Sequence, residues 1–431
     1  MQVNDLLNRF THFGVELGLE RIERLLAALG NPERQVPIVH VAGSNGKGSV
    51  CAYLASVLTT AGYRVGRYTS PHLVSWCERI CLNQQPIPAL ELYALLKQVL
   101  AAIDPQQTSP TQFEVITAAA WLYFAQQQVD IAIVEVGLGG RLDATNVCER
   151  PLVSVITSLS LEHWQRLGPT LADISREKAG ILKSACPAVI APQPPAAEAV
   201  LRQRLSQLDC PAVWVEPAQD LGEGWAEFRF SPTAAFRYPL PLLGQHQLIN
   251  SAVALATLTL LQQQGWAISS AQIQQGMAAT QWPGRMQWSQ WQGCPLLIDG
   301  AHNPAGAEML RDYLDRSLNR NLERNLDSGP LEPPMRWVLG MIGTKDHSDI
   351  LKALLRPGDW LYLVPVPEHL PTDLAKLAEL AWQVCPELAA CELYEDVIPA
   401  LNRAAQAQTG TLVLCGSLYL IGHFMQVRTT F

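Results

Sequence analysis

The sequence predicts an α/β fold in two domains, each built around a parallel β-sheet. Short apolar strands alternate with helices through most of the chain, which is the pattern of a parallel sheet covered on both faces. A glycine-rich turn joins the first strand to the helix after it, as in a βαβ unit. The alternation restarts near residue 294, and a length of 431 residues suits two or three domains of roughly 100–200 residues.

The first domain is predicted to open with helices and to continue as a sheet. Apolar residues at helical spacing, from Ile22 to Leu29, are followed by the helix stop Gly30-Asn31-Pro32. A strand over 38–42 leads into the glycine-rich turn, and a helix over 49–61 precedes the next strand at 63–69. Further apolar strands are predicted over residues 131–136, 152–157 and 188–191.

The second domain repeats this alternation. The tract 317–334 is rich in Asn, Arg, Gly and Pro, so it is predicted to be an exposed loop. We place the domain boundary between residues 293 and 294, which divides the chain into 1–293 and 294–431. Strands of the second domain are predicted over 295–298, 336–339, 360–364 and 411–415, with helices between them.

Composition excludes several classes of protein. With 48% hydrophobic and 16% charged residues, the chain is predicted to fold rather than to be disordered. A formal net charge of −8 argues against a general nucleic-acid binder. The 10 cysteines are scattered without zinc-ligand spacing, which is typical of reduced packing residues in a cytosolic protein. The sequence shows neither a signal peptide nor an apolar stretch long enough to span a membrane, so we expect a cytoplasmic protein.

Residues 43–49 form a candidate phosphate-binding turn. Glycines let several backbone N–H groups point at phosphate oxygens, the following helix presents its positive end, and Lys47 can reach the β- and γ-phosphates of a nucleotide. The match to GxxxxGK[ST] is imperfect, because Val41 stands at the first glycine position and Gly48 separates Lys47 from Ser49. An ordinary glycine-rich turn is the alternative. The candidate ATP-binding residues here are Gly43, Ser44, Asn45, Gly46, Lys47, Gly48 and Ser49.

Two charged residues stand in apolar surroundings. Glu135 ends a strand that is otherwise apolar, and α/β proteins bind ligands at the carboxyl ends of their strands. Lys178 lies four residues after Ile174 and three before Ile181, so it falls on the apolar face of its helix. Burial would depress the pKa of its amine, and a neutral amine can react with carbon dioxide. The alternatives are a snorkelling lysine or an ion pair with a neighbouring carboxylate.

Residues 40–49, which depart from the usual phosphate-loop pattern, resemble the nucleotide loop of the folylpolyglutamate synthase/dihydrofolate synthase family, within the Mur ligase superfamily. Segments similar to that family follow its order through nearly the whole chain. They begin at residues 17–22, 40–49, 70–73 and 135–146, and continue at 176–181, 244–247, 282–285, 299–304 and 416–419. The resemblance implies a P-loop ATPase domain with N-terminal helices over 1–293 and a smaller Rossmann-like domain over 294–431.

The same resemblance implies a reaction and its cofactors. ATP phosphorylates a substrate carboxylate, and the amine of L-glutamate displaces phosphate from this acyl phosphate to form an amide. The acid would be dihydropteroate or a folate, the other products ADP and phosphate, and the enzyme a monomer. Two Mg²⁺ ions are expected, and the family relation also allows for a monovalent cation.

Roles for individual residues follow from the resemblance alone. Lys47, His163 and Lys178 are the implied catalytic residues, with Lys178 carbamylated as N6-carboxylysine. Glu162 precedes His163 where the family usually has aspartate, and Gln112 replaces a commonly aromatic residue. The implied metal ligands are Ser70, Glu135, His163 and carbamylated Lys178; the implied pterin contacts are Phe113, Asp143, Glu16 and Leu17; and further nucleotide contacts are Asn250, Arg285, Asp299 and His302.

Rival interpretations remain open at this point. A Mur-type ligase or another amino-acid ligase would share the architecture, and a P-loop phosphotransferase or nucleotide-gated ATPase would share the turn. Segment 364–369 lacks an arginine that the family often carries, which leaves glutamate contacts in the second domain unassigned. The sequence also leaves open whether the enzyme makes dihydrofolate, extends polyglutamate chains, or does both.

Overall fold

The computed structural model describes residues 3–13, 16–231, 233–323, 332–343, 346–367, 372–407 and 409–428. The chain divides into two compact units. The first runs up to Pro241 and includes His246–Gln281, and the second combines Leu242–Gln245 with the chain from Trp282 onward. Each unit is an α/β structure, as predicted.

The first unit is built on an eight-stranded sheet with the order β4-β3-β2-β5-β1-β6-β7-β8. The strands from β2 to β8 pair in parallel in this order, which confirms the predicted parallel sheet, and β3 and β4 add an antiparallel edge. The strands are β1 (Ile38–Ala42), β2 (Val65–Tyr68), β3 (Ile80–Leu82), β4 (Gln85–Pro86), β5 (Ile131–Glu135), β6 (Val153–Ile156), β7 (Ala188–Ile190) and β8 (Ala212–Trp214).

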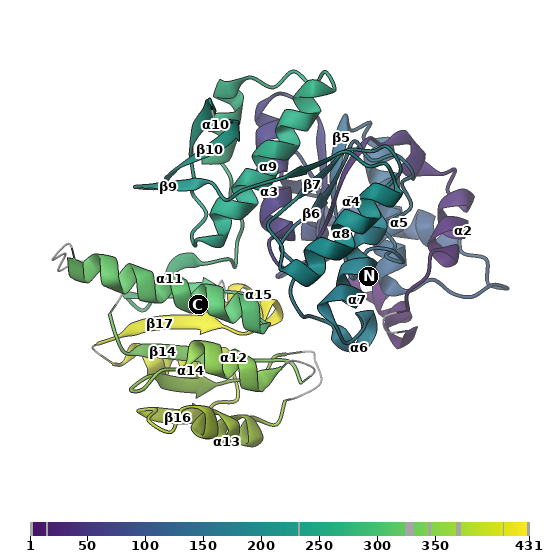
Figure 1. The fold of residues 1–431 in the computed structure, drawn as a ribbon. Coiled ribbons are helices and arrows are strands. Elements are labelled where there is room, and N and C mark those ends of the chain that lie inside the picture. The colour runs from purple at the N-terminus through teal and green to yellow at the C-terminus, as the bar shows by residue number, and fades with distance from the viewer. Residues whose placement is uncertain are drawn as a thin grey trace. The chain divides into compact units, whose positions relative to one another are not determined.

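Helices cover both faces of this sheet (Figure 1). On one face α3 (Lys47–Thr60) packs against α9 (His246–Gln263) and α10 (Ser270–Ala278). On the other face, Ile38 of β1 lies in one core cluster with residues of α5, and Ala42 of β1 lies in another with residues of α8. The helices near that face are α1 (Val3–Leu7), α2 (Glu20–Ala28), α4 (Ala89–Ala101), α5 (Gln112–Gln126), α7 (Leu171–Lys178) and α8 (Pro195–Gln207).

A small antiparallel sheet in the first unit was not predicted. Its strands are β9 (Gln219–Gly222), β10 (Trp225–Ser231) and β11 (Ala234–Pro239), in the order β11-β10-β9. Most described side chains of β9 and β11 are exposed or half-buried. No continuous buried run therefore marks β9 or β11 in the sequence, so periodicity does not predict this sheet.

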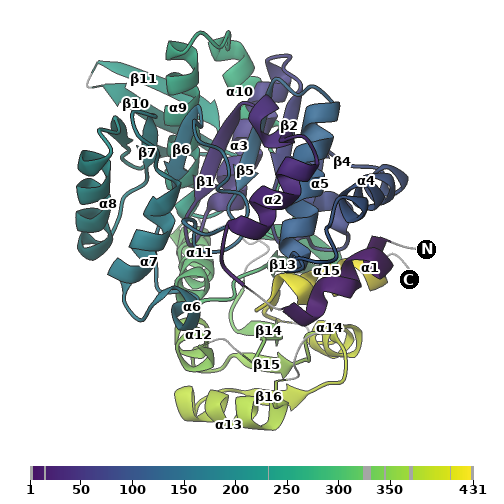
Figure 2. The ribbon, with the colours of Figure 1, turned by 90° about the vertical axis from the view of Figure 1, so that its right-hand side faces the viewer.

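The second unit contains a six-stranded sheet with the order β12-β13-β17-β14-β15-β16. Only the pair between β12 and β13 is antiparallel. Helices α11, α12 and α13 lie on one face of this sheet and α14 and α15 on the other (Figure 2). The elements are β12 (Gln287–Trp291), β13 (Cys294–Asp299), α11 (Pro304–Glu323), β14 (Met335–Leu339), α12 (His347–Leu354), β15 (Trp360–Leu363), α13 (Leu374–Val384), β16 (Ala390–Leu393), α14 (Val397–Ala405), β17 (Thr411–Cys415) and α15 (Leu418–Arg428).

The structure differs from two expectations for the second unit. The unit begins at Trp282, ahead of residue 294, because β12 pairs with β13 along its whole length. The loop predicted over 317–334 is wrong in its first part, since α11 continues to Glu323. Leu314 and Leu318 explain the longer helix, because both pack on the core of this unit at a spacing of one helical turn. Residues 324–331, and Glu368 and His369 of the segment that lacks the arginine, lie outside the described residues.

Candidate functional site

The glycine-rich turn connects the central strand β1 to α3. The helix begins at Lys47, two residues before the predicted start, so Gly48 and Ser49 lie in its first turn. The amides of Ser44 and Asn45 donate to the carbonyl of Ser158, at 3.0 and 3.2 Å. The hydroxyl of Thr157 donates to the carbonyl of Asn45 at 2.8 Å. The loop that follows β6 therefore fixes the shape of the turn.

Two glycines are required by close approaches to this turn. A Cβ on Gly43 would lie 1.8 Å from Oγ1 of Thr157. Gly46 has φ +89°, and a Cβ there would lie 2.2 Å from Oδ1 of Asn250 in α9. The structure thus brings the predicted nucleotide residue Asn250 against the turn. Asn250 donates to Gln247 at 3.2 Å, and Gln247 donates to the hydroxyl of Ser49 at 3.2 Å.

Two lysine ammonium groups converge on one carbonyl of the turn. Nζ of Lys47 donates to the carbonyls of Gly43 and Ser44, at 2.8 and 3.1 Å. Nζ of Lys178 donates to the same Gly43 carbonyl at 2.8 Å and forms an ion pair with Glu162 at 2.7 Å. Because Glu162 neutralises Lys178, the Lys47 ammonium is the one of the two ammonium groups that suits an anionic ligand such as a nucleoside triphosphate.

Lys178 is the last residue of α7, and only 2% of it is exposed, which confirms the predicted burial. The side chain of Thr170 and that of Asp173 cap the start of this helix reciprocally, so its register is fixed. Burial lowers the pKa of the Lys178 amine, although Glu162 acts in the opposite direction. Burial also opposes ionisation of Glu162, but Lys178, Lys47 and His163 outweigh it and hold the pKa of Glu162 below its usual range.

Glu135 and Ser70 meet at the carboxyl ends of neighbouring strands. Glu135 ends β5, is 4% exposed, and accepts a hydrogen bond from the amide of Ser70 at 3.2 Å. Its register partner is Val41, so its side chain lies on the face of the sheet that α3 covers. His163 lies in the loop after β6, is exposed, and has the left-handed backbone conformation with φ 48°.

These residues fit the expected cations to different degrees. Mg²⁺ prefers oxygen ligands and is usually held by one or two carboxylates together with water and substrate phosphates, so the Glu135 carboxylate and the Ser70 hydroxyl suit it. In the part of the chain that the structure describes, no three His, Cys, Asp or Glu side chains are grouped to hold a metal ion. Lys178, as an ammonium paired with Glu162, offers no lone pair to a cation, so a ligand role for it requires the carbamate.

A second cluster forms around residues 137 and 138, which follow β5. A Cβ on Gly137 would lie 2.3 Å from Cζ of Phe113, so the Phe113 ring rests on this backbone. Oδ2 of Asp143 accepts a hydrogen bond from the amide of Leu138 at 2.8 Å. Burial raises the pKa of Asp143, which is 3% exposed. The structure therefore brings the two principal pterin candidates to the same short segment.

The N-terminal segment joins this second cluster. The amide of Gly18 donates to the carbonyl of Leu142 at 3.3 Å, which places the chain next to Leu17 beside the loop of Asp143. Arg21 bridges the region, because it donates to the carbonyl of Glu16 at 2.9 Å and to the carboxylate of Glu114 at 3.0 Å. No sequence pattern predicts the Arg21–Glu114 pair, since the two residues are 93 positions apart.

The other three nucleotide candidates lie together in the second unit. Asp299 ends β13 and accepts hydrogen bonds from the amides of Met286 and Ala301, both at 2.8 Å. Burial raises the pKa of Asp299, while nearby Arg285 lowers it. His302 contacts the carbonyl of Gly300 through Nδ1 at 2.8 Å. Arg285, Asp299 and His302 thus surround the turn that follows β13.

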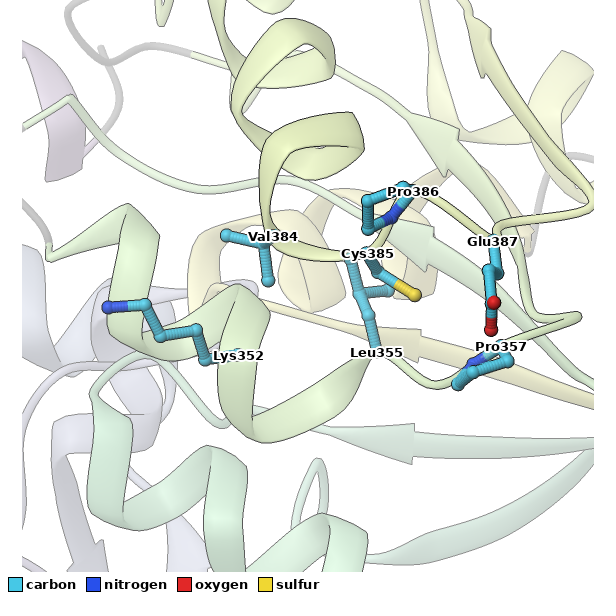
Figure 3. Close-up of a pocket in the computed structure, with 7 residues that line it drawn as sticks. All are labelled: Lys352, Leu355, Pro357, Val384, Cys385, Pro386 and Glu387. Atoms are coloured by element: carbon cyan, nitrogen blue, oxygen red, sulfur yellow. The ribbon is translucent and has the colours of Figure 1, made fainter.

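A cavity of about 340 Å³ in the second unit contains none of the predicted site residues. It is lined by the segments that precede β15 and β16, with Lys352 and Glu387 at opposite ends (Figure 3). These segments lie at the amino ends of parallel strands, whereas ligands of α/β sheets bind at the carboxyl ends.

Among the residues that the structure describes, no helix is long and apolar enough to cross a membrane.

Comparisons with known proteins agree with this geometry. Residues 41–258 match the family model described as Mur ligase middle domain, and residues 285–427 match the model described as dihydrofolate synthetase, C-terminal domain. The chain is 40% identical over 429 residues to the dihydrofolate synthase/folylpolyglutamate synthase of Bacillus subtilis, an alignment that covers 95% of this chain and 94% of that protein.

Solved structures are similar over almost the whole chain. Folylpolyglutamate synthase of Mycobacterium tuberculosis, complexed with ADP, has a TM-score of 0.86 at 29% identity, over 99% of this chain and 97% of that chain. Escherichia coli FolC, in complex with DHPP and ADP, has a TM-score of 0.81 at 30% identity, over 99% and 96%. Both units of this chain therefore place it in the dihydrofolate synthase/folylpolyglutamate synthase family, within the Mur ligases.

Proposed function

We propose that this protein is an ATP-dependent ligase that joins L-glutamate to the carboxylate of dihydropteroate or a folate. The observation that carries the proposal is the juxtaposition within the first unit. The glycine-rich turn, with the Lys47 ammonium beside it, follows β1 at the same carboxyl end of the sheet at which Glu135 ends β5. The Phe113–Asp143 cluster lies at the segment that follows β5. Phosphate, cation and pterin chemistry are thus combined in one unit.

ATP is the proposed phosphoryl donor. When ATP binds, Nζ of Lys47 exchanges its hydrogen bonds to the carbonyls of Gly43 and Ser44 for hydrogen bonds to the β- and γ-phosphates. The phosphates are the stronger acceptors because they are charged. Backbone N–H groups at the start of α3 bind the same phosphates. Asn250 from α9 adjoins this turn, and Arg285, Asp299 and His302 are proposed as the nucleotide contacts of the second unit.

The proposed chemistry has two steps. A carboxylate oxygen of the substrate attacks the γ-phosphorus, and the bond to the bridging oxygen of ADP breaks, which gives an acyl phosphate. The amine of glutamate then attacks the acyl carbon, loses a proton, and expels phosphate, which leaves an amide. Lys47 stabilises the negative charge that develops on the transferred phosphoryl group.

Mg²⁺ is the proposed metal, and when bound it would offset the repulsion between the carboxylate and the triphosphate. Ser70 and Glu135 are the proposed ligands of one ion. His163 and Lys178, as N6-carboxylysine, are the proposed ligands of the other. The buried position of Lys178 supports the modification, since burial lowers the pKa of its amine. Intact-protein mass measured in bicarbonate buffer checks it, because the carbamate adds the mass of one carbon dioxide and is lost in acid.

Phe113 and Asp143 are the proposed contacts of the pterin ring. The aromatic face suits stacking, and a carboxylate suits the N–H donors of the ring. Glu16 and Leu17 are proposed to border the same site through the contacts of their neighbours, Gly18 and Arg21. We also propose that the enzyme acts as a monomer in the cytoplasm, which fits its ten free cysteines.

Glutamate-dependent phosphate release tests the function. The purified protein is given Mg²⁺, ATP and dihydropteroate, with and without glutamate, and the product is weighed by mass spectrometry. We expect release that needs both the acid and glutamate, and a product heavier by one glutamate residue. Release that is independent of glutamate, or that occurs with UDP-linked peptidoglycan precursors instead of dihydropteroate, would contradict the proposal. Tetrahydrofolate as the acid tests chain extension in the same assay.

Paired lysine variants locate the activity in the turn. Lys47→Ala is expected to abolish measurable ATP binding, because it removes the cation that reaches the phosphates. Lys97→Ala is the matched control, since Lys97 is exposed on α4 and has no proposed contact with any substrate. Unchanged ATP affinity in Lys47→Ala would refute the assignment of this turn.

A further inference from the structure

A buried chain of hydrogen bonds ends at Asp143. His40 is the third residue of the central strand β1 and is fully buried. Its Nε2 lies 2.9 Å from Oγ1 of Thr145, and that hydroxyl lies 2.6 Å from Oδ1 of Asp143. Thr145 is fully buried as well, so solvent does not compete for either bond. The three residues form a single connected path from the sheet to the loop.

The direction of these hydrogen bonds is fixed by the acceptor at the end. An ionised carboxylate can only accept hydrogen bonds, and Asp143 accepts from the amides of Leu138 and Thr145 and from the Thr145 hydroxyl. The Thr145 hydroxyl must therefore donate to Asp143 and accept from His40. This assigns the proton of the neutral imidazole to Nε2, and Nδ1 has no hydrogen-bond partner among the described residues. Burial lowers the pKa of His40 to about 3, which keeps the ring neutral.

The two oxygens of Asp143 are held differently. Oδ1 accepts both the amide of Thr145, at 3.0 Å, and its hydroxyl, at 2.6 Å. Oδ2 accepts the amide of Leu138 at 2.8 Å, beside the residue that contacts the Phe113 ring. The backbone of Gly137 also donates to the carboxylate. Because both donors of Thr145 meet Oδ1, we expect an N–H group of a ligand to meet Oδ2. The two hydrogen bonds from Thr145 to Oδ1 thus fix the rotation of the Asp143 carboxylate and with it the direction of Oδ2.

We propose that His40 and Thr145 are positioning residues that orient the Asp143 carboxylate for the donor edge of the substrate's pterin ring. The inference rests on the proposed function, because it takes Asp143 as a pterin contact. His40 directs the lone pairs and the proton of Thr145, and Thr145 fixes the rotation of Asp143. A carboxylate that is already oriented loses less conformational freedom on binding, so affinity for the ring depends on the whole chain of bonds.

Substitutions at Thr145 test the inference with a matched control. Thr145→Val keeps the shape but removes the hydroxyl, and we expect the KM for dihydropteroate to rise about tenfold, as for one lost hydrogen bond. The KM for ATP is expected to stay within about twofold, and Thr145→Ser is expected to restore the wild-type KM. Thr257→Val is the control, since Thr257 is equally buried but bonds only within α9.

Substitutions at His40 repeat the test from the other end of the chain. The amide nitrogen of glutamine can take the place of Nε2, whereas the shorter asparagine cannot reach it. We therefore expect His40→Gln to keep a KM for dihydropteroate near that of the wild type and His40→Asn to raise it. If Thr145→Val does not fold, the comparison of His40→Gln with His40→Asn still tests whether the hydrogen bond from residue 40 to Thr145 affects the KM for dihydropteroate.

A double substitution separates positioning from general destabilisation. If Thr145 acts through Asp143, then Thr145→Val is expected to have no further effect on the KM for dihydropteroate when Asp143→Asn is already present. Equal rises in the KM for ATP and dihydropteroate, or an additive effect in the double variant, would overturn the inference while leaving the proposed function intact. Wild-type protein that does not use dihydropteroate or folates at all would overturn the proposed function itself.

Discussion

Nζ of Lys178 lies 2.7 Å from Oε1 of Glu162, and the two side chains are 3% and 9% exposed. The structure therefore answers one alternative from the sequence: in its unmodified form the lysine is paired with a nearby carboxylate. Glu162 stands where the family usually has an aspartate, which is shorter by one methylene group. Lys178 also donates to the Gly43 carbonyl of the phosphate turn. The Lys178 amine must leave Glu162 before it can become a carbamate.

Removing one partner of this buried pair is expected to destabilise the protein. In protein prepared without bicarbonate, so that Lys178 is unmodified, Glu162→Gln leaves the Lys178 ammonium without its counter-charge, and we expect the free energy of unfolding to fall by about 3 kcal/mol. Urea denaturation at pH 7 measures it. The control is Glu198→Gln, because the Glu198–Arg202 pair is exposed and is expected to contribute less than about 1 kcal/mol. Equal losses in the two variants would show that burial of the Lys178 pair has no energetic consequence.

Alanine at Gly46 is expected to impair ATP binding as well as stability. Gly46 and Gly62 both have positive φ, at +89° and +92°, so alanine strains the backbone by about 1 kcal/mol at either position. Only Gly46 adjoins Asn250, whereas nothing lies within 4 Å of a Cβ on Gly62. We expect Gly46→Ala to raise the KM for ATP and Gly62→Ala to leave it unchanged. A normal KM in Gly46→Ala would separate this glycine from the nucleotide site.

The stability of the first unit is expected to decrease in mild acid because of His40. Burial lowers the pKa of His40 from 6.5 to about 3. As the pH falls, the unfolded chain therefore binds the proton before the folded protein does. The stability that the neutral His40 ring contributes is present above pH 6.5 and is lost as the pH falls toward 3. Between pH 7 and pH 5 this amounts to about 2 kcal/mol. Urea unfolding of wild type and His40→Gln at both pH values measures the difference, and identical pH dependence would contradict the buried neutral ring.

Loss of the Ser70 hydroxyl is expected to weaken the response to magnesium. If Ser70 and Glu135 hold one ion, then Ser70→Ala should raise the Mg²⁺ concentration for half-maximal activity about tenfold, as one lost ligand contact would. Ser75→Ala is the control in the same loop, because Ser75 only caps the helical turn that follows it. A magnesium titration of phosphate release compares them. The same midpoint in both variants would exclude Ser70 from the metal site.

Local patterns explain why much of the fold could be predicted from the sequence. Strands such as β1 and β5 are apolar except for His40 and Glu135, because helices cover them on both faces. The burial of Lys178 followed from its spacing of four residues from Ile174 in α7, although Ile181 lies in the 3-10 turn after that helix. The sheet of β9 to β11 was missed because β9 and β11 are mostly exposed or half-buried and carry no such run. The end of α11 was placed too early because its last turns are mostly polar.

The contacts within the site could not be predicted in the same way. Lys178 and Glu162 come from different segments, and His40 and Thr145 are 105 positions apart. Such pairs depend on which strand lies next to which, and spacing along one element carries no information on that. The roles assigned from the resemblance named Asp143 and Lys178, but only the structure shows the partners that orient and charge them.

The transfer of oxygen from the substrate acid to phosphate tests the central claim most directly. Dihydropteroate labelled with ¹⁸O in its carboxylate is incubated with the protein, Mg²⁺, ATP and glutamate, and the released phosphate is analysed by mass spectrometry. An acyl phosphate requires that one labelled oxygen leaves with each phosphate when the amide forms. The account predicts singly labelled phosphate in equal amount to the amide product. Amide formation with unlabelled phosphate would contradict it.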